Sequence, residues 1–153
     1  MKQLNPKHVA AVVKRANDCP YFRLLSMELK ELEWGRSRLE LSVREKHIQF
    51  FGVIHGGVCA SVLDAAAWWA VYGALDDGVG LTTVEIKLNF LAPVAQGRLV
   101  ASGKGIKIGK KICLGEASVL DDQSVLVAHG TSTMMVLDSF SVPGSGSIPP
   151  KFL

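Results

Sequence analysis

One stretch decides how this chain folds: residues 47–75, which read HIQFFGVIHGGVCASVLDAAAWWAVYGAL. Asp64 is the only aspartate, glutamate, lysine or arginine in this stretch. A charged side chain inside so apolar a segment is costly unless it is paired, hydrogen-bonded or used in chemistry. The stretch therefore predicts a helix that carries a single acid with a specific task.

The central helix is apolar on every side, so the rest of the protein has to enclose it. Residues 58–75 approach the roughly 20 residues that span a bilayer. They also contain Asp64, follow two glycines and lack a flanking cluster of positive charge, and these features disfavour a membrane span. We therefore expect a buried core helix and no association with a membrane.

The segments around this helix predict strands. Residues 37–43 alternate apolar and polar side chains, as a strand with one buried face does. In residues 81–91 the apolar set Val84, Ile86, Leu88 and Phe90 alternates with the polar set Thr83, Glu85, Lys87 and Asn89. In order, we expect a helix over 5–17, a short turn over 21–25, strands over 26–33 and 37–43, the central helix over 56–75, and strands over 81–91, 98–108, 112–120 and 125–137.

This order predicts an α+β fold. The simplest packing is an antiparallel sheet of about six strands with the long helix against one face. We expect a single domain over residues 1–138, followed by a loosely ordered tail over 139–153 that is rich in proline, glycine and serine. The long sheet edges need cover, which dimerisation through paired sheets would supply.

Composition and charge exclude several classes of protein. The chain has 153 residues, a net charge of +3 and a pI of about 8.8. Its basic residues are scattered, which disfavours nucleic acid as a partner and suits an anionic small molecule. The four histidines are too dispersed for a zinc motif, so no metal is expected. The N-terminus lacks the apolar core of a secretory signal, and the cysteines are few and far apart, which predicts a cytoplasmic protein with reduced thiols.

The glycine pair Gly56-Gly57 predicts the start of the central helix. The backbone amides and dipole at a helix N-terminus can receive negative charge. Gly56 and Asp64 are eight residues apart, which is about 12 Å along the helix axis. A base and an oxyanion donor must both lie within roughly 3 Å of one reacting group. If both act together, they have to come from two subunits that meet at a dimer interface.

Each candidate residue also has a purely structural interpretation. Asp64 could be held by hydrogen bonds from Ser61 or from a backbone amide. His55 could cap the glycine turn, and Thr83 lies in a strand, where threonine is favoured anyway. The lysines near residue 110 could be a solvated hairpin tip.

Several motifs follow one another along the chain. The first is Gln49-x-x-Gly52-x-x-His55-Gly56-Gly57, with Asp64 nine residues after the histidine. The later ones are Thr83-x-Glu85-x-x-x-x-Phe90-x-x-Pro93, Gly97, and Lys107-x-Gly109-Lys110-Lys111.

The combination resembles the signature of hotdog-fold thioesterases over residues 20–137. The most similar branch is the phenylacetate-degradation type, which includes one class of 4-hydroxybenzoyl-CoA thioesterases. The resemblance implies a hydrolase with a sheet wrapped around its helix, an acyl-CoA substrate and no separate cofactor. It also implies a homodimer or homotetramer.

The resemblance implies a role for each matching residue. Asp64 would be the general base or the nucleophile, and the Gly56 amide of the other subunit would be the oxyanion donor. Gln49 and His55 would orient the thioester or the loop around it, and Thr83 would help to hold the attacking water.

A second set of residues would bind the substrate. Relatives place their lysine turn near the CoA phosphates, and Coulomb attraction supports that role here. We expect the binding residues to be Phe90, Lys107, Gly109, Lys110 and Lys111.

Two rival functions stay open on the sequence. One is a non-catalytic acyl-CoA-binding protein, and the other is a hotdog dehydratase or hydratase. Gln49 resembles aryl-CoA-specific relatives whereas Asp64 resembles the phenylacetate branch, so the acyl group is open. Trp68, Trp69, Phe50, Phe51 and Phe90 are candidates to line its pocket.

Overall fold

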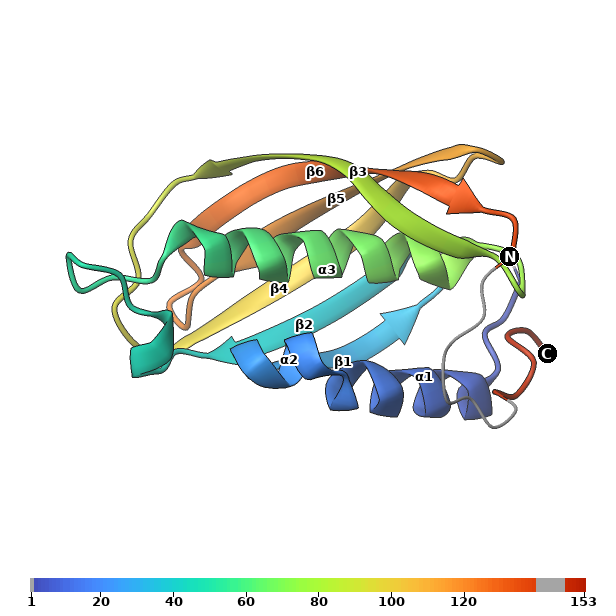
Figure 1. Ribbon diagram of the computed structural model, residues 1–153, viewed down its shortest axis with the longest axis horizontal. Helices are drawn as coiled ribbons and strands as arrows, with labels where there is room; N and C mark the ends of the chain where they lie inside the picture. The colour runs from blue at the N-terminus through green and yellow to red at the C-terminus, as the bar shows by residue number, and fades with distance from the viewer. Residues whose placement is uncertain (1, 140–147) are drawn as a thin grey trace.

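The computed structural model describes residues 2–139 and 148–153 (Figure 1). Among these residues the six strands and the first and central helices follow the predicted order, with ends within about two residues of the predicted ones. The turn predicted over 21–25 is instead a short helix, which begins at Pro20, a residue favoured in the first turn of a helix. The elements are α1 (Pro6–Asp18), α2 (Pro20–Leu25), β1 (Met27–Glu33), β2 (Arg36–Ser42), α3 (Gly56–Ala74), β3 (Gly80–Phe90), β4 (Arg98–Lys107), β5 (Ile112–Leu120) and β6 (Leu126–Leu137), with a short 3-10 turn, η1 (Glu45–His47), before α3.

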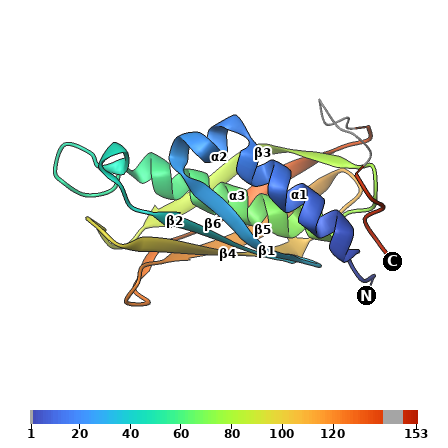
Figure 2. The ribbon, with the colours of Figure 1, turned by 90° about the horizontal axis from the view of Figure 1, so that it is seen from below.

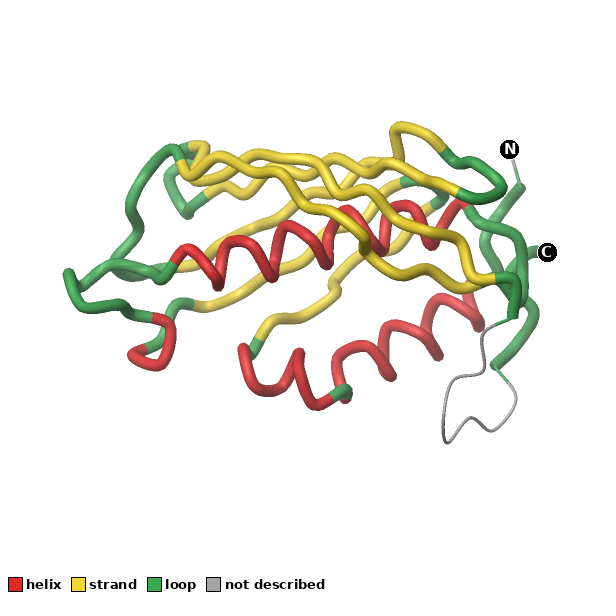
Figure 3. Tube along the Cα trace, turned by 45° about the horizontal axis from the view of Figure 1, so that its top comes forward, coloured by secondary structure: helices red, strands yellow, loops and turns green. Residues whose placement is uncertain are grey.

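The six strands form one antiparallel sheet in the order β1-β2-β4-β5-β6-β3. The sheet curves around α3, which lies along its inner face (Figure 1). The tube view shows the α1–α2 segment beside α3 (Figure 3). Both shorter helices lie on the same side of the sheet as α3 (Figure 2). The predicted α+β architecture is therefore confirmed.

Small residues let α3 approach the sheet backbone closely. A side-chain carbon added to Gly103 would lie 2.1 Å from the carbonyl oxygen of Ala66, and one added to Gly115 would lie 2.8 Å from that of Ala67. Ser37 fills the remaining gap and donates a hydrogen bond of 2.6 Å to the Ala66 carbonyl. Apolar side chains of helix and sheet, such as Val62, Leu39 and Leu99, are fully buried around these contacts. No helix among the described residues is long and apolar enough to cross a membrane.

Strand β3 is an edge of the sheet and contains a β-bulge. Its pairing with β6 shifts between Thr83 and Glu85, which leaves Val84 as the extra residue. The bulge changes the alternation predicted for this strand: Thr83 turns to the helix side, together with Ile86 and Phe90. The prediction that Thr83 lies on the opposite face of the sheet from Ile86 and Phe90 is therefore wrong. One inserted residue moves the side chains that precede it in the strand to the other face.

The C-terminal segment packs back onto the helices. Residues 140–147 of the predicted loose tail lie outside the described residues, but residues 148–153 are held in place. Lys151 is only 1% exposed: its amine lies over the Tyr72 ring and donates to the Tyr72 carbonyl at the end of α3. Its backbone amide donates to Asp77 and its carbonyl accepts from Asn5. These six residues are thus anchored, in contrast to the loose order that the composition predicts.

Candidate active site

Asp64 lies halfway along α3, and two hydroxyl groups hold its carboxylate. Ser132 of β6 donates a hydrogen bond of 2.7 Å to Oδ1. Thr83 of β3 donates to both oxygens, at 3.1 Å and 3.3 Å. No lysine, arginine or histidine of the described residues forms an ion pair with this carboxylate. Two neutral donors from neighbouring strands therefore orient the Asp64 side chain.

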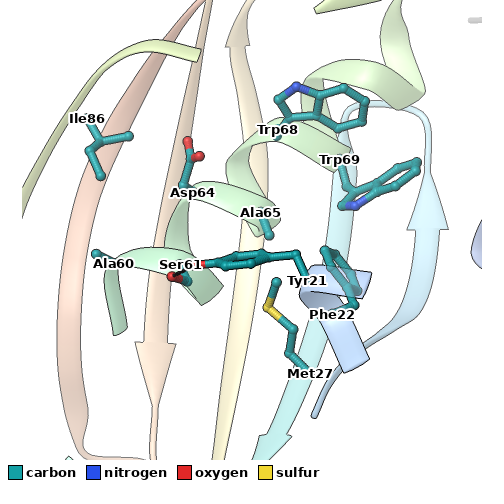
Figure 4. A pocket seen from close by; sticks show the side chains of 10 residues that line it. All are labelled: Tyr21, Phe22, Met27, Ala60, Ser61, Asp64, Ala65, Trp68, Trp69 and Ile86. Atoms are coloured by element: carbon teal, nitrogen blue, oxygen red, sulfur yellow. Dashed lines mark hydrogen bonds between the residues drawn. The ribbon is translucent and has the colours of Figure 1, made fainter. Parts of the chain in front are cut away.

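Asp64 opens into a cleft of about 410 Å³ between α3, α2 and the edge strand β3. Figure 4 shows the carboxylate among mostly apolar side chains, with Trp68 and Trp69 to one side and Ile86 to the other. The small Ala60 and Ala65 leave room beside the acid, and the predicted wall by Trp68 is present. A reacting group bound here would meet the carboxylate in a largely apolar setting, where charge interactions are stronger than in water.

Ser61 belongs to a different set of hydrogen bonds. Its hydroxyl donates to the Gly57 carbonyl one turn earlier, at 2.8 Å, and accepts from the Tyr21 hydroxyl, at 2.6 Å. The alternative in which Ser61 holds Asp64 is therefore wrong, because the serine proton is directed to its own helix backbone.

Gly56 begins α3 and lies in a second cleft, also of about 410 Å³. The Gly56 amide has no acceptor among the described residues, as expected for the first turn of a helix. The Phe90 ring covers it so closely that a side-chain carbon on Gly56 would lie 3.0 Å from the ring. The amide that is predicted to receive negative charge thus lies beside an aromatic wall, in a cleft that does not include Asp64.

His55 is the N-cap of α3. Its Nδ1 accepts a hydrogen bond of 2.8 Å from the Gly57 amide, so the structural interpretation of this histidine is confirmed. Its own amide donates to the carbonyl of His47, which is buried and bonded at both ring nitrogens to backbone groups. Burial lowers the pKa of His47, which keeps that ring neutral as a support for the loop.

Gln49 shapes the loop that leads to Gly56. Its side-chain oxygen accepts from the Phe51 amide, and its carbonyl accepts from the Gly52 amide at 2.9 Å. Gly52 has φ +81°, a left-handed conformation that favours glycine. Gln49 lines neither cleft, and Phe50 and Phe51 are almost fully exposed at the tip of the same loop rather than in an acyl pocket.

The lysine turn joins β4 to β5 and is exposed. Lys107, Lys110 and Lys111 lie beside the end of β6, where the Lys111 carbonyl accepts from the Val136 amide. Gly109 is required in the turn, because a side chain there would meet the Ile112 carbonyl at 2.3 Å. Within one chain these lysines are at the end of the sheet opposite to Phe90, so the predicted binding residues do not form one group.

Two residues of the site were missed by sequence reasoning. Ser132 is fully buried in a strand whose other inward positions are Ala128, Gly130 and Met134, so a single hydroxyl in this alternation was a usable signal. Tyr21 lies in the segment predicted as a short turn, and no pattern in the sequence indicated its bond to Ser61. Cys59 lies in the Gly56 cleft, where burial raises the pKa of its thiol and keeps it protonated.

Comparison with known proteins identifies the family of this chain. The family model of the Thioesterase superfamily matches residues 51–128. A Saccharolobus solfataricus protein named "Putative esterase SSO1253" is 40% identical over 78 residues, which cover 50% of this chain and 50% of that protein. The chain thus matches about half the length of that curated relative.

Solved structures of the same shape exist. A thioesterase of Haemophilus influenzae superposes with a TM-score of 0.81 at 19% identity and covers 95% of this chain and 100% of its own. The E. coli PaaI protein from the phenylacetic acid degradation operon superposes with a TM-score of 0.79 at 18% identity, over 89% of this chain and 97% of its own. At these identities the likeness shows the fold. Together with the family match, it establishes that the chain belongs to the Thioesterase superfamily and has the hotdog fold.

Proposed function

We propose that this protein hydrolyses acyl-CoA thioesters, with Asp64 as the general base or the nucleophile. One observation carries the proposal: a carboxylate with no cationic partner among the described residues, held by Ser132 and Thr83 at the wall of an apolar cleft. An acid with a purely structural role in such a helix would be expected to pair with a cation or to be protonated, and hence neutral. Here two neutral donors orient it toward space that a substrate can enter.

The unpaired edge of β3 supports a dimeric site. If two β3 strands pair about a two-fold axis at Lys87, each Lys87 faces the partner's Lys87. The extra residue Val84 then shifts the register, so that Thr83 of one strand faces the partner's Phe90. Thr83 is bonded to Asp64, and Phe90 covers Gly56. This pairing therefore brings Asp64 next to the partner's Gly56, and its symmetry creates two equal sites. It also covers Val84 and Ile86, which are exposed apolar residues on an open edge.

The reaction follows from this arrangement. The Asp64 carboxylate accepts a proton from water, and the resulting hydroxide adds to the thioester carbon. The partner's Gly56 amide donates a hydrogen bond to the oxyanion that forms. When the C–S bond breaks, the CoA thiolate leaves and takes the proton from Asp64. The products are the thiol form of CoA and the carboxylic acid, and Asp64 is again a carboxylate. The alternative in which Asp64 itself adds to the carbon uses the same geometry.

The same pairing suggests a place for CoA. The lysine turn lies near the start of β3, and an antiparallel partner strand brings its Phe90 end to that side. We place the phosphates of CoA at Lys107, Lys110 and Lys111, with the pantetheine arm running toward the partner's Phe90.

The three cysteines are free thiols, which supports the proposal of a cytoplasmic location.

Subunit complementation tests the shared site. Gly56→Pro removes the amide proton and adds ring carbons beside Phe90. The backbone suits proline, which is favoured at the first helical position, and His55 has the extended angles (φ −63°, ψ 136°) that suit the residue before proline. Gly56→Ala, which keeps the amide, is the matched control for the contact with Phe90. Asp64→Asn and Gly56→Pro chains are co-expressed with different tags, and thiol release from acyl-CoAs is measured.

Each variant alone is expected to be nearly inactive. Random assembly makes half of the dimers mixed, and each mixed dimer has one complete site out of two, so activity returns to about a quarter of the wild-type value. Failure to recover activity in purified mixed dimers would refute the shared site. A wild-type protein that binds acyl-CoAs and releases no thiol would instead favour a non-catalytic binding protein.

A further inference from the structure

A third cavity lies beyond the Asp64 cleft, outside the site described above. It has a volume of about 470 Å³ and lies between α1, the second half of α3 and the start of β3. Its described wall is largely apolar and includes Val12, Ala16, Cys19 and Val79. We call it the distal compartment.

The distal compartment adjoins the Asp64 cleft. The two cavities share three side chains, Phe22, Trp68 and Trp69. Trp68 stacks on Tyr72 with an interplanar angle of 7°, and Trp69 meets both rings edge-on. Asp64, Trp68 and Tyr72 are each four residues apart, so they follow one side of α3 over about 12 Å. A continuous aromatic surface therefore leads from the carboxylate into the compartment.

Polar groups in this wall are already hydrogen-bonded. His8 bonds through Nδ1 to the Pro149 carbonyl, so its Nε2 accepts from the Tyr72 hydroxyl at 3.0 Å when the ring is neutral. Burial raises the pKa of Tyr72 to about 12, which keeps the hydroxyl protonated. Asp77 accepts from the Lys151 amide, and Arg15 has an interaction of its own. What these groups leave for a ligand is mainly apolar surface.

We propose that the distal compartment receives the far end of an unbranched, medium-chain acyl group whose thioester lies at Asp64. This inference rests on the proposed function and extends it to a substrate class. A short or single-ring acyl group would fill the Asp64 cleft alone, whereas a longer chain passes along Trp68 and Trp69 into the second cavity. Each methylene buried there improves binding roughly fourfold.

The test measures binding and hydrolysis separately. Trp68 and Trp69 are natural fluorescence reporters, and Trp34→Phe removes the remaining tryptophan, which lies in the turn between β1 and β2. Sodium dodecanoate and sodium butyrate are titrated into this variant. Val79→Phe fills the compartment, Cys19→Phe fills it from another side if the first variant folds poorly, and Val125→Phe is the matched control at an exposed site outside it.

We expect a saturable fluorescence change with dodecanoate that Val79→Phe or Cys19→Phe weakens at least tenfold and Val125→Phe leaves unchanged. In the hydrolysis assay, the ratio of kcat/KM for dodecanoyl-CoA to that for butyryl-CoA should fall at least tenfold in the filled variants. An unchanged ratio, or no saturable change with dodecanoate, would overturn the inference. Dodecanoate binding that the filling variants abolish, in a protein that hydrolyses no thioester, would support the compartment and refute the hydrolase.

Discussion

The two clefts along α3 have similar sizes and opposite chemistry. The Asp64 cleft contains an acid held by two hydroxyls, and the Gly56 cleft contains a backbone amide with no acceptor among the described residues. Neither contains both parts of an acyl-transfer site, and eight residues of rigid helix separate them. The comparison teaches what the proposed hydrolysis requires: two copies of the chain would have to meet, with each copy supplying opposite halves to two sites.

The largest expected effect is at the acid half. Asp64→Asn keeps the shape and one acceptor oxygen for the hydroxyls but removes the base, so kcat for acyl-CoA hydrolysis should fall by roughly 10²–10⁴-fold. Circular dichroism and gel filtration should be unchanged. Asp76→Asn, an exposed acid just beyond the same helix, is the matched control. Near-wild-type turnover by Asp64→Asn would remove Asp64 from the mechanism.

The amide half should respond nearly as strongly. Loss of one oxyanion donor typically costs about 10²–10³-fold in kcat, and we expect this for Gly56→Pro. Gly56→Ala should lose far less, since only the flexible, half-exposed Phe90 ring has to move. Equal losses in the two variants would show that the contact with Phe90, rather than the amide proton, matters.

The hydroxyls that hold Asp64 should have smaller effects. Hydrogen bonds to charged groups contribute about 1.5–3 kcal/mol, or roughly 10–100-fold. Ser132→Ala removes the shorter bond and should lower kcat toward the upper part of that range, with little change in KM. Thr83→Val should lower it less, and Thr83→Ser should restore it. A loss in Thr83→Ser equal to that in Thr83→Val would show that packing, not the hydroxyl, is responsible.

The lysine turn should act on binding alone. In the double variant Lys110→Ala/Lys111→Ala, KM for acyl-CoA should rise several-fold at low salt and differ little at high salt, because exposed charges are screened. The matched substrate is the acyl-pantetheine thioester, which lacks the nucleotide phosphates. An equal rise in KM for both thioesters would show that the turn does not contact the phosphates.

The smallest effect concerns stability at the far end of α3. Burial lowers the pKa of Lys151 from 10.5 to about 8. Between pH 8 and pH 10.5 the unfolded chain therefore binds more protons than the folded chain, so the stability of the wild-type protein rises with pH in this range. Below pH 8 the charged amine costs about 3 kcal/mol. The Tm of Lys151→Met relative to wild type should therefore decrease by roughly 5–10 °C from pH 7 to pH 10.5. A difference in Tm that does not change with pH would refute this account.

The order and limits of the strands and of the two long helices were predictable because the apolar residues of each recur at the spacing of its own type of secondary structure. The central helix was also predictable as an enclosed element, since its apolar residues surround it on every side. The separation of Gly56 from Asp64 followed from the helical rise alone, and the structure places them in two clefts.

What could not be predicted depends on single residues that break a period or on contacts distant in sequence. The bulge at Val84 has no marker in the sequence, so the strand pattern put Thr83 on the wrong face. Ser132 is 68 residues from Asp64, and only the sheet order brings them together. The C-terminal segment has a composition typical of loose chain, yet one buried lysine anchors it.

The contact between Gly103, Gly115 and the backbone of Ala66 and Ala67 has a consequence for how substrate preference can change. Close contact between the two backbones sets the position of the helix, and Ser132 and Thr83 orient the carboxylate, so the aromatic side chains of the cleft wall take no part in that placement. Trp68, Trp69 and Tyr21 can therefore be exchanged for larger or smaller residues while the carboxylate keeps its position. A thioesterase built this way can come to accept new acyl groups through mutations in its cleft walls, while the residues that carry out the reaction stay in place.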